Sequence, residues 1–171
     1  MKHAVVFVHN ALTGAGLREH VQVIACGKIV SGFDIAVALA IGADLCYSAR
    51  GMMFALGCIQ ARRCHANTCP TGITTQHPWR VHGLDVEDKT QRVARFHGAT
   101  VNAFLTLIAA LGLEDAHELG PERLWKRVAP TRYESYGELY SWLEPGALLE
   151  DPASCGAPYS AAWSAARSDR F

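Results

Sequence analysis

The first 57 residues alternate between strand-like and helix-like apolar runs, separated by turns that contain glycine. Residues 5–12 predict the end of a helix, and residues 33–41 predict a second helix that ends at the following glycine. Two short apolar runs, 21–25 and 43–48, predict strands, the first of them buried, and a further helix is expected over 52–57. A strand, a glycine-containing loop and a helix, repeated twice, are typical of a parallel βα architecture.

The rest of the chain divides into three stretches by its pattern. Residues 58–90 lack clear periodicity and indicate an ordered loop. From Val93 onwards, apolar residues recur every three or four positions, which predicts a long helix that begins near Asp85. We expect this helix and shorter amphipathic pieces to form a helical extension over 91–150, and we expect the Ala- and Ser-rich tail 151–171 to be poorly ordered.

The composition describes a folded chain without a strong overall charge. Half of the 171 residues are hydrophobic and 19% are charged, which excludes an intrinsically disordered protein. Sixteen basic residues balance sixteen acidic ones, so no overall field attracts nucleic acid or an anionic membrane, and we expect neither as a partner. No apolar run reaches the ~20 residues that span a bilayer. The start of the chain lacks the pattern of a signal peptide, so a cytoplasmic protein is expected.

The cysteines are distributed unevenly along the chain. Three of the six, Cys58, Cys64 and Cys69, lie within twelve residues, with five and then four residues between them, and Pro70 follows the last. Zinc sites usually pair cysteines about two to four residues apart and use about four ligands. A proline after a ligand cysteine recurs in ferredoxin-type sequences, and three thiolates suit a cluster with one ligand for each of three irons. The residues favour an iron–sulfur cluster; a zinc site completed by His65, and structural or redox-active cysteines, remain alternatives.

Glycines also follow both predicted strands, directly before the next helix. Gly27 and Gly32 lie in the first loop, and Gly51 lies in the second. Such loops expose backbone N–H groups that bind phosphates, although neither matches a Walker or Rossmann sequence and each alone also fits a simple turn. In eight-stranded βα barrels, two consecutive loops of this kind commonly build a phosphate site, which favours a phosphate-bearing ligand here.

Residues 26–76 resemble the FMN-binding domain of glutamate synthase, and most closely the FMN-binding glutamate synthase family that lacks much of the large multidomain enzyme. The most specific part is the run Cys64-His65-Ala66-Asn67-Thr68-Cys69-Pro70-Thr71-Gly72-Ile73, followed by Thr75-Gln76. Further matching runs are Ala25 to Asp34, Gly42-Ala43-Asp44, Ser48-Ala49-Arg50-Gly51, Ala55 to Gln60, Gly83 to Lys89 and Leu143 to Gly146. The likeness covers nearly everything except the final twenty residues.

The resemblance implies an α/β fold: about the last two βα units of a (β/α)8 TIM barrel over 1–57, an iron–sulfur cluster loop over 58–90, and C-terminal helices after it. It implies FMN and a 3Fe–4S cluster as cofactors. The family's three cluster ligands match Cys58, Cys64 and Cys69. The loops that lie at the family's FMN phosphate match Gly27, Lys28, Ala49, Arg50 and Gly51. No catalytic residue within this chain is implied.

The resemblance also implies a reaction. In the family, FMN passes electrons to 2-iminoglutarate, which forms from 2-oxoglutarate and glutamine-derived ammonia, and the product is L-glutamate. The cluster relays single electrons from a partner. The implied partners are the missing N-terminal barrel portion or a complementary subunit, an electron donor (ferredoxin or an NAD(P)H-oxidising subunit), and a glutamine amidotransferase subunit. The chain is therefore expected to be the C-terminal piece of a longer oxidoreductase, inactive by itself; the alternative is a non-catalytic iron–sulfur electron-transfer or assembly subunit.

Overall fold

The computed structural model describes residues 1–169, which contain two separate two-stranded sheets. β1 (Ile24–Cys26) pairs in parallel with β2 (Leu45–Tyr47), and β3 (Trp125–Ala129) pairs antiparallel with β4 (Arg132–Ser135). The α-helices are α1 (Lys2–Gly14), α2 (Gly32–Ala40), α3 (Ala49–Ala55), α4 (Pro78–Val81), α5 (Val86–Ala110), α6 (Tyr136–Leu139), α7 (Ala147–Glu150) and α8 (Tyr159–Ala165). One-turn 3-10 helices lie at Arg18–His20, Cys64–Ala66, Ala116–Glu118 and Pro121–Arg123. The chain has a mixed α/β structure, and the sheets within residues 1–169 do not close into a barrel.

The segment from β1 to α3 confirms the alternation predicted from the apolar pattern. β1 and β2 are parallel neighbours, with Ala25 opposite Cys46, and α2 connects them. α2 begins after Ser31, whose hydroxyl accepts the N–H of Asp34 while the Asp34 carboxylate accepts the N–H of Ser31 (3.2 and 3.0 Å). This capping box satisfies two backbone donors and fixes the start of α2. Because the two strands are parallel, the loops that follow them lie at the same edge of the sheet.

The first strand of the parallel sheet is less buried than the sequence predicted. Ala25 is 1% exposed, but Ile24, Leu45 and Tyr47 are 42%, 48% and 61% exposed. Ala25 and Cys46 belong to the core on the side of α2, and successive residues of a strand point to opposite faces. The opposite face is uncovered by the described residues, and its side chains are apolar as well. A strand that is covered on one face only can therefore have the same continuous run of apolar residues as a strand that is buried on both faces.

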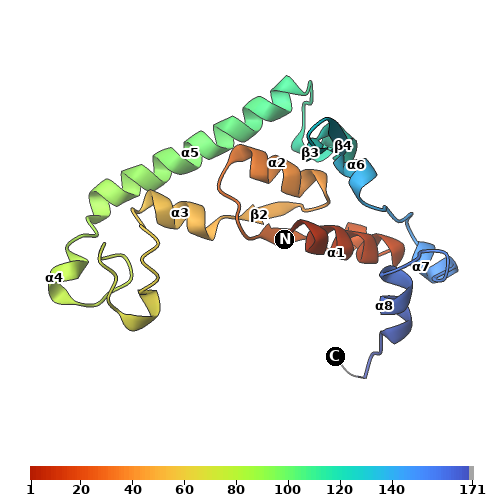
Figure 1. Ribbon diagram of the computed structural model, residues 1–171, viewed down its shortest axis with the longest axis horizontal. Coiled ribbons are helices and arrows are strands. Elements are labelled where there is room, and N and C mark those ends of the chain that lie inside the picture. Colours follow the sequence, from red (N-terminus) through yellow and green to blue (C-terminus); the bar gives the residue numbers. More distant parts are fainter. Residues whose placement is uncertain (170–171) are drawn as a thin grey trace.

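The core is built around α2. Its small and branched side chains are almost completely buried: Ala36, Val37, Ala38 and Ile41. α5 crosses α2 and adds Phe104 and Ile108 to the same core (Figure 1). At the crossing, a Cβ atom on Gly32 would overlap the backbone of α5. Only glycine allows the two helices to approach so closely, and a larger residue would push α5 away from α2.

α5 returns the chain from the cysteine loop to the core (Figure 1). As the sequence predicted, it begins after Asp85, whose carboxylate accepts the N–H of Asp88 (2.9 Å). Most of its surface is exposed, and its buried residues are Phe104 and Ile108. By length and composition alone, α5 would be able to cross a membrane; this is weak support for a membrane span, because the core helix of a soluble protein passes the same test.

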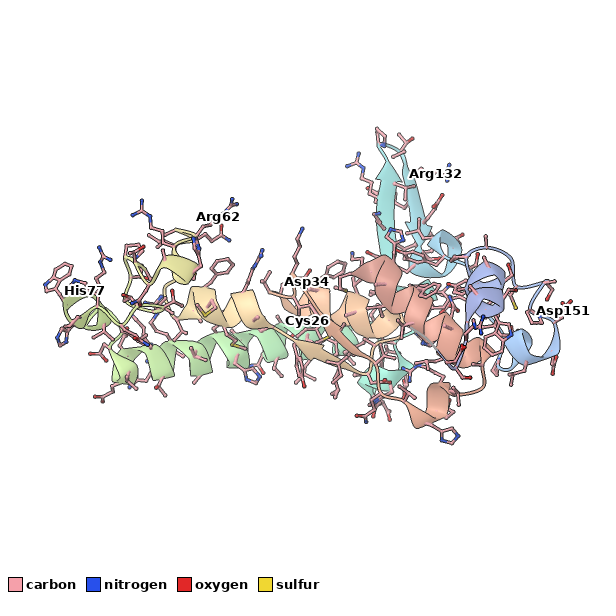
Figure 2. The ribbon with its side chains drawn as sticks, turned by 90° about the horizontal axis from the view of Figure 1, so that it is seen from below. Cys26, Asp34, Arg62, His77, Arg132 and Asp151 are labelled. Atoms are coloured by element: carbon pink, nitrogen blue, oxygen red, sulfur yellow. The ribbon has the colours of Figure 1, made fainter. Side chains whose placement is uncertain are left out.

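Residues 91–150 are not helical throughout, in contrast to the predicted helical extension. β3 and β4 form a hairpin in which Lys126 lies opposite Glu134, and residues 130–131 make the turn. Figure 2 shows this hairpin projecting from the body of the molecule. Trp125 and Tyr133 are more than half exposed. The hairpin therefore has no buried face that would produce a period of two in the sequence.

The C-terminal segment is folded, in contrast to the poorly ordered tail predicted over 151–171. α8 packs on α1 through Tyr159, which is 7% exposed. The Tyr159 hydroxyl accepts a hydrogen bond from Asn10 Nδ2 (2.7 Å), and its ring stacks on Phe7 with 5.5 Å between the ring centroids. The prediction is therefore wrong for the described part of the tail, and residues 170–171 lie outside it.

Asn10 holds the C-terminal segment at two further points. We call residues 140–165 the C-terminal strap. Asn10 is completely buried on α1; its amide donates to the Ser141 carbonyl (2.9 Å), and its oxygen accepts the N–H of Leu143 (2.9 Å). Together with the bond to Tyr159, both polar ends of the Asn10 side chain are satisfied by the strap. A buried amide with such partners fixes the strap in one position on α1.

His9 lies where α1, the turn after α2 and the C-terminal strap meet. Its Nδ1 accepts a hydrogen bond from Arg18 Nε (3.1 Å), and its ring packs edge to face with Trp142, with 5.7 Å between the centroids. The Arg18 guanidinium also binds the Asp44 carboxylate (2.7 Å). Burial and the charge of Arg18 lower the pKa of His9 below its usual value of 6.5, and the opposing effects of the Gly42 backbone and of Asp44 are smaller.

We expect the chain to lose stability as the pH falls through 6.5, because of His9. Below that pH the unfolded chain binds a proton that the folded chain excludes, so the free energy of unfolding decreases on acidification. Burial raises the pKa of Asp44, but the bonds from Arg18 and Val23 outweigh it and hold that pKa below 3.8, so Asp44 titrates outside this interval.

Urea unfolding near pH 7.5 and near pH 5.5 measures this pH dependence. In His9→Gln, a neutral amide oxygen can accept from Arg18, and most of the pH dependence in this interval should disappear. If the wild-type chain and His9→Gln lost the same free energy of unfolding between these two pH values, the pH dependence would not come from His9.

Candidate functional site

The glycine-containing loops after β1 and β2 lie together at the carboxyl edge of the parallel sheet. The Ser48 hydroxyl donates a hydrogen bond to the Ile29 carbonyl (2.6 Å), which ties the second loop to the first. In the first loop, Gly27 and Lys28 have positive φ angles of 116° and 59°. In the second loop, residues 49–51 form the first turn of α3. All five residues predicted to hold a phosphate therefore lie at one edge of the sheet.

Gly51 is required by close packing in the second loop. A Cβ atom at this position would lie 2.5 Å from Ser48 Oγ and 3.2 Å from the Phe96 ring of α5. Any side chain would therefore displace either α5 or the hydroxyl that ties the two loops together. The sequence indicated Gly51 only as a backbone donor, and the packing gives a second reason for glycine.

Part of the first loop is already occupied by a carboxylate of this chain. The Asp34 carboxylate accepts the N–H groups of Val30 (3.2 Å) and Ser31 (3.0 Å). Because these donors are used and a negative charge lies beside them, this part of the loop does not suit a second anion. The turns at 27–28 and 49–51 are better placed to receive a phosphate.

Cys58 is positioned by the end of α3. Gly57 ends the helix with a positive φ of 100°, and the Cys58 N–H donates to the Met53 carbonyl (3.0 Å). This is the usual bonding of a helix that ends at glycine. The Cys58 sulfur in turn accepts the Gln60 N–H at 3.5 Å. The first of the three clustered cysteines therefore follows a defined helix end directly.

Asn67 folds back the segment that carries Cys64 and Cys69. It has a left-handed conformation with φ 57°. Its side-chain oxygen accepts the Gln76 N–H (2.7 Å), and its carbonyl accepts the Thr75 hydroxyl (2.7 Å). These bonds close a loop over residues 67–76 that contains Cys69, which is buried; Cys64 lies just before this loop and is exposed.

Hydrogen-bond donors surround the Cys69 sulfur. The Thr71 hydroxyl lies 3.3 Å from it. Hydrogen bonds from this hydroxyl and from the Thr74 backbone outweigh the effect of burial and lower the pKa of the Cys69 thiol to about 6. The sulfur is therefore mostly ionised at neutral pH, and the thiolate is the form that binds metals.

Cys58, Cys64 and Cys69 line one cavity of about 500 Å³. It lies at the end of the molecule where Figure 2 labels Arg62. Three basic side chains line it as well: Arg50, Arg62 and Arg63. None of the described residues that line it is acidic. An anionic group in this cavity would therefore be close to the charges of three arginines and to no carboxylate.

The three clustered cysteines do not converge on a single point. Within residues 1–169, no three His, Cys, Asp or Glu side chains form a group that could hold one metal ion. A zinc ion needs about four ligands around one centre, whereas an iron–sulfur cluster takes its thiolates on separate irons. Three thiolates match the ligand number of a cluster with one ligand on each of three irons, and they are one fewer than a zinc site usually has. The other three cysteines (Cys26, Cys46 and Cys155) do not line the cavity.

The Thr74 hydroxyl is unsatisfied in the wall of the same cavity. Its oxygen is buried, and it has no hydrogen-bond partner among the described residues. It is near enough to contribute to the low pKa of the Cys69 thiol, but it does not reach hydrogen-bond geometry with that sulfur. Buried polar groups nearly always have a partner. The orphaned hydroxyl therefore fits a cavity that is built to hold a further group.

Arg50 belongs to both parts of the site. It lies in the turn 49–51 and also lines the cysteine cavity, which its position in the sequence did not indicate. The phosphate turns and the cysteine cavity are therefore neighbours, connected by α3. Sequence reasoning missed the roles of Thr71 and Thr74, because threonine carries no spacing signal and both act only through the folded loop.

Comparison with known proteins supplies the family context. Residues 1–114 match the family model described as a conserved region in glutamate synthase. The chain is similar to the glutamate synthase large subunit-like protein YerD of Bacillus subtilis, with 40% identity over 121 residues, which are 71% of this chain and 23% of that protein. It is also similar to the archaeal glutamate synthase (NADPH) of Methanocaldococcus jannaschii, with 36% identity over 120 residues, 70% of this chain and 24% of that protein.

A plant relative shows the same pattern. The ferredoxin-dependent glutamate synthase 2, chloroplastic, of Arabidopsis thaliana is 36% identical over 117 residues, which cover 64% of this chain and 7% of that protein. The chain therefore spans about a quarter or less of the length of these relatives. The family match ends at residue 114, before the β3–β4 hairpin and the C-terminal strap begin.

Proposed function

The chain belongs to the glutamate synthase family, and we propose that it supplies the iron–sulfur ligands and part of the flavin phosphate site of an oxidoreductase of that family. The observation that carries the proposal is the single cavity lined by Cys58, Cys64 and Cys69 together with basic side chains. The phosphate turns lie next to this cavity and share Arg50 with it.

In the proposed centre, Cys58, Cys64 and Cys69 are the thiolate ligands of a 3Fe–4S cluster. All three are free cysteines on the wall of one cavity, and the pKa of the Cys69 thiol is lowered to about 6. The Gln60 N–H donates to the Cys58 sulfur, and hydrogen bonds to sulfurs are among the features that set the potential of such clusters. When bound, the cluster would supply transfer of single electrons.

We further propose that the turns at 27–28 and 49–51 hold the phosphate of FMN. In parallel βα structures, ligands bind at the carboxyl ends of the strands, where these two turns lie. Gly27 lets the backbone approach an anion closely, while Lys28 and Arg50 supply positive charge. When bound, the flavin would supply hydride transfer to the substrate. The protein's part is to orient the flavin and to keep it close to the cluster.

β1, α2, β2 and α3 are proposed to be the last two βα units of a (β/α)8 barrel. Ile24, Leu45 and Tyr47 form an uncovered apolar face that a barrel interior would bury. β1 and β2 pair only with each other among the described residues, and closure into a barrel is what removes such open edges. The remaining strands would come from an N-terminal portion of the protein or from a complementary subunit.

The complete enzyme would form L-glutamate from 2-oxoglutarate and glutamine-derived ammonia. Its electron donor would be ferredoxin or an NAD(P)H-oxidising subunit, the two classes that occur in the names of the relatives. A glutamine amidotransferase subunit would supply the ammonia, and we propose the cytoplasm as the location. A non-catalytic iron–sulfur electron-transfer subunit is the second candidate, favoured by the small number of strands here that can enclose a flavin ring.

We expect the chain by itself to bind FMN more weakly than micromolar and to form no glutamate. Much of the affinity for a ligand of this size comes from burying its apolar surface. The flavin ring would lie against the other strands of the proposed barrel, and the parallel sheet of the described residues has two strands, β1 and β2. Co-expression with the N-terminal barrel portion of the Bacillus relative should give stoichiometric FMN, measured by flavin fluorescence and absorbance.

Two variants and two outcomes make this test decisive. In the complemented protein, Gly51→Val should weaken FMN binding, while the exposed Asn102→Ala on α5 should leave it unchanged. Stoichiometric FMN and turnover in the isolated chain would contradict the barrel proposal. A complemented protein that holds the cluster but no flavin would favour the electron-transfer subunit.

A further inference from the structure

We infer that the Thr74 hydroxyl donates a hydrogen bond to a sulfur of the cluster held by Cys58, Cys64 and Cys69, and that this bond raises the reduction potential of the cluster. The inference rests on the proposed function, because it requires the cluster in the cavity. It assigns a role to a side chain that the cysteine spacing leaves without one.

Thr74 is unusual in this loop because its hydroxyl lies near the Cys69 sulfur but makes no hydrogen bond within residues 1–169. Its oxygen is buried and has no partner among the described residues. The adjacent Thr75 is also buried, but its hydroxyl donates to the Asn67 carbonyl at 2.7 Å. The Thr75 hydroxyl therefore has a carbonyl acceptor within the loop, whereas the Thr74 hydroxyl lies at the cavity wall without one.

The chemistry of the cavity decides which acceptor Thr74 can find there. The described residues that line the cavity bring no carboxylate, and its acidic groups are the three cysteine thiols. The Cys69 sulfur already has the Thr71 hydroxyl at 3.3 Å. Most of the other lining side chains are apolar or basic, including Met53, Phe54 and three arginines, and these accept no hydrogen bond of ordinary strength. The Gln60 amide and the Thr71 hydroxyl also line the cavity, but neither bonds Thr74. Sulfur atoms of a bound cluster are thus the further acceptors that an occupied cavity would bring to Thr74.

A hydrogen bond of this kind favours the reduced cluster. Reduction adds one electron and makes the cluster one unit more negative, while the threonine keeps its proton. The positive end of the O–H dipole stabilises the more negative state more strongly, and hydrogen bonds to sulfurs raise the potential of iron–sulfur clusters for this reason. Removal of the hydroxyl should therefore make the cluster harder to reduce without removing a ligand.

The test compares Thr74→Val with Thr74→Ser in the full chain, reconstituted anaerobically with ferrous iron and sulfide. Iron per chain and visible absorbance are measured first, and a mediated titration with dithionite, followed by electron paramagnetic resonance, then gives the potential. Thr74→Val should keep its iron and decrease the equilibrium constant for one-electron reduction about threefold to tenfold, where tenfold corresponds to about 59 mV. Thr74→Ser should restore most of the wild-type potential. Thr90→Val, on the exposed surface of α5, is the control for the substitution itself.

The outcomes separate the inference from the proposed function. An iron-loaded Thr74→Val with the wild-type potential overturns the inference alone, and this is the result expected if a water molecule satisfies Thr74. If Thr74→Val loses iron, Thr74→Ala removes the hydroxyl without adding a methyl group; a lowered potential then supports the inference, and an unchanged one overturns it. A wild-type chain that binds zinc and no iron overturns the proposed function and the inference together.

Discussion

Replacement of Cys64 by serine should remove most of the iron that the chain takes up on anaerobic reconstitution. The wild-type chain should bind about three irons, one for each thiolate of the proposed centre. Cys64 shares its cavity with Cys58 and Cys69, and none of the other described residues on the cavity wall is a cysteine or a histidine that could replace it. A serine hydroxyl remains protonated at neutral pH and is a poor ligand for iron in this setting. One iron would therefore lose its protein ligand, and the cluster should not persist.

The matched control for this experiment is Cys155→Ser. Cys155 is a free cysteine of intermediate burial that lies in the C-terminal strap and does not line the cavity. Its replacement should leave both the iron content and the visible absorbance unchanged. Stoichiometric zinc without iron–sulfur absorbance in the wild-type chain would contradict the cluster assignment, and so would full iron content in Cys64→Ser.

Asn10→Ala should destabilise the chain by about 3 kcal/mol, because a buried group that loses its hydrogen-bond partner costs about 1–3 kcal/mol. The completely buried amide serves three partners in the strap: Ser141, Leu143 and Tyr159. Alanine would leave the part-buried Ser141 carbonyl and Leu143 N–H, and the buried Tyr159 hydroxyl, without that partner. The strap should then detach from α1 at lower denaturant concentration than the core unfolds.

Urea unfolding and limited proteolysis measure this effect, and two variants calibrate it. Tyr159→Phe removes one of the three bonds and should cost about 1 kcal/mol. Asn102→Ala, on the exposed surface of α5, should change the free energy of unfolding by less than about 0.5 kcal/mol. A loss in Asn10→Ala no larger than that in Tyr159→Phe would contradict the role assigned to the two backbone contacts.

The helices that carry their own start signals are the part of the fold that the sequence predicts well. Asp85 before α5 and Ser31 with Asp34 before α2 are caps that act within four residues, so their effect is visible locally. The order of β1, α2, β2 and α3 follows from the same kind of signal, because glycine-containing turns mark the end of each element.

The elements that the sequence missed depend on contacts far along the chain or on none at all. α8 is held by the bond between Asn10 and Tyr159, and no local pattern in the Ala- and Ser-rich tail indicates that partner. The pattern does not indicate the β3–β4 hairpin, because Trp125 and Tyr133 are exposed and neither strand shows the alternation of a half-buried sheet. Hydrophobic periodicity reveals neither a contact between residues far apart in the sequence nor a strand that is exposed on both faces.

In the candidate site, too, some residues are indicated by the sequence and others are revealed only by the folded structure. Cysteine spacing identifies Cys58, Cys64 and Cys69, and the structure brings them to one cavity, although their binding of a cluster stays a prediction. Spacing says nothing of Thr74, whose importance comes from a hydroxyl that the folded loop leaves unsatisfied. Arg50 was assigned to the phosphate turn alone, because its second position on the cysteine cavity depends on how the loop after α3 folds back.

The bond between Asn10 and Tyr159 can form only late in protein synthesis. The two residues are 149 positions apart, so α1 leaves the ribosome long before its partner exists. At about 5–20 residues per second, the interval is about 7 to 30 s. During that time the amide of Asn10 has only water to bind, and Phe7 lacks the ring that later stacks on it. The contacts between α1 and the C-terminal strap are thus among the last in the fold to form, long after α1 can pack against α2.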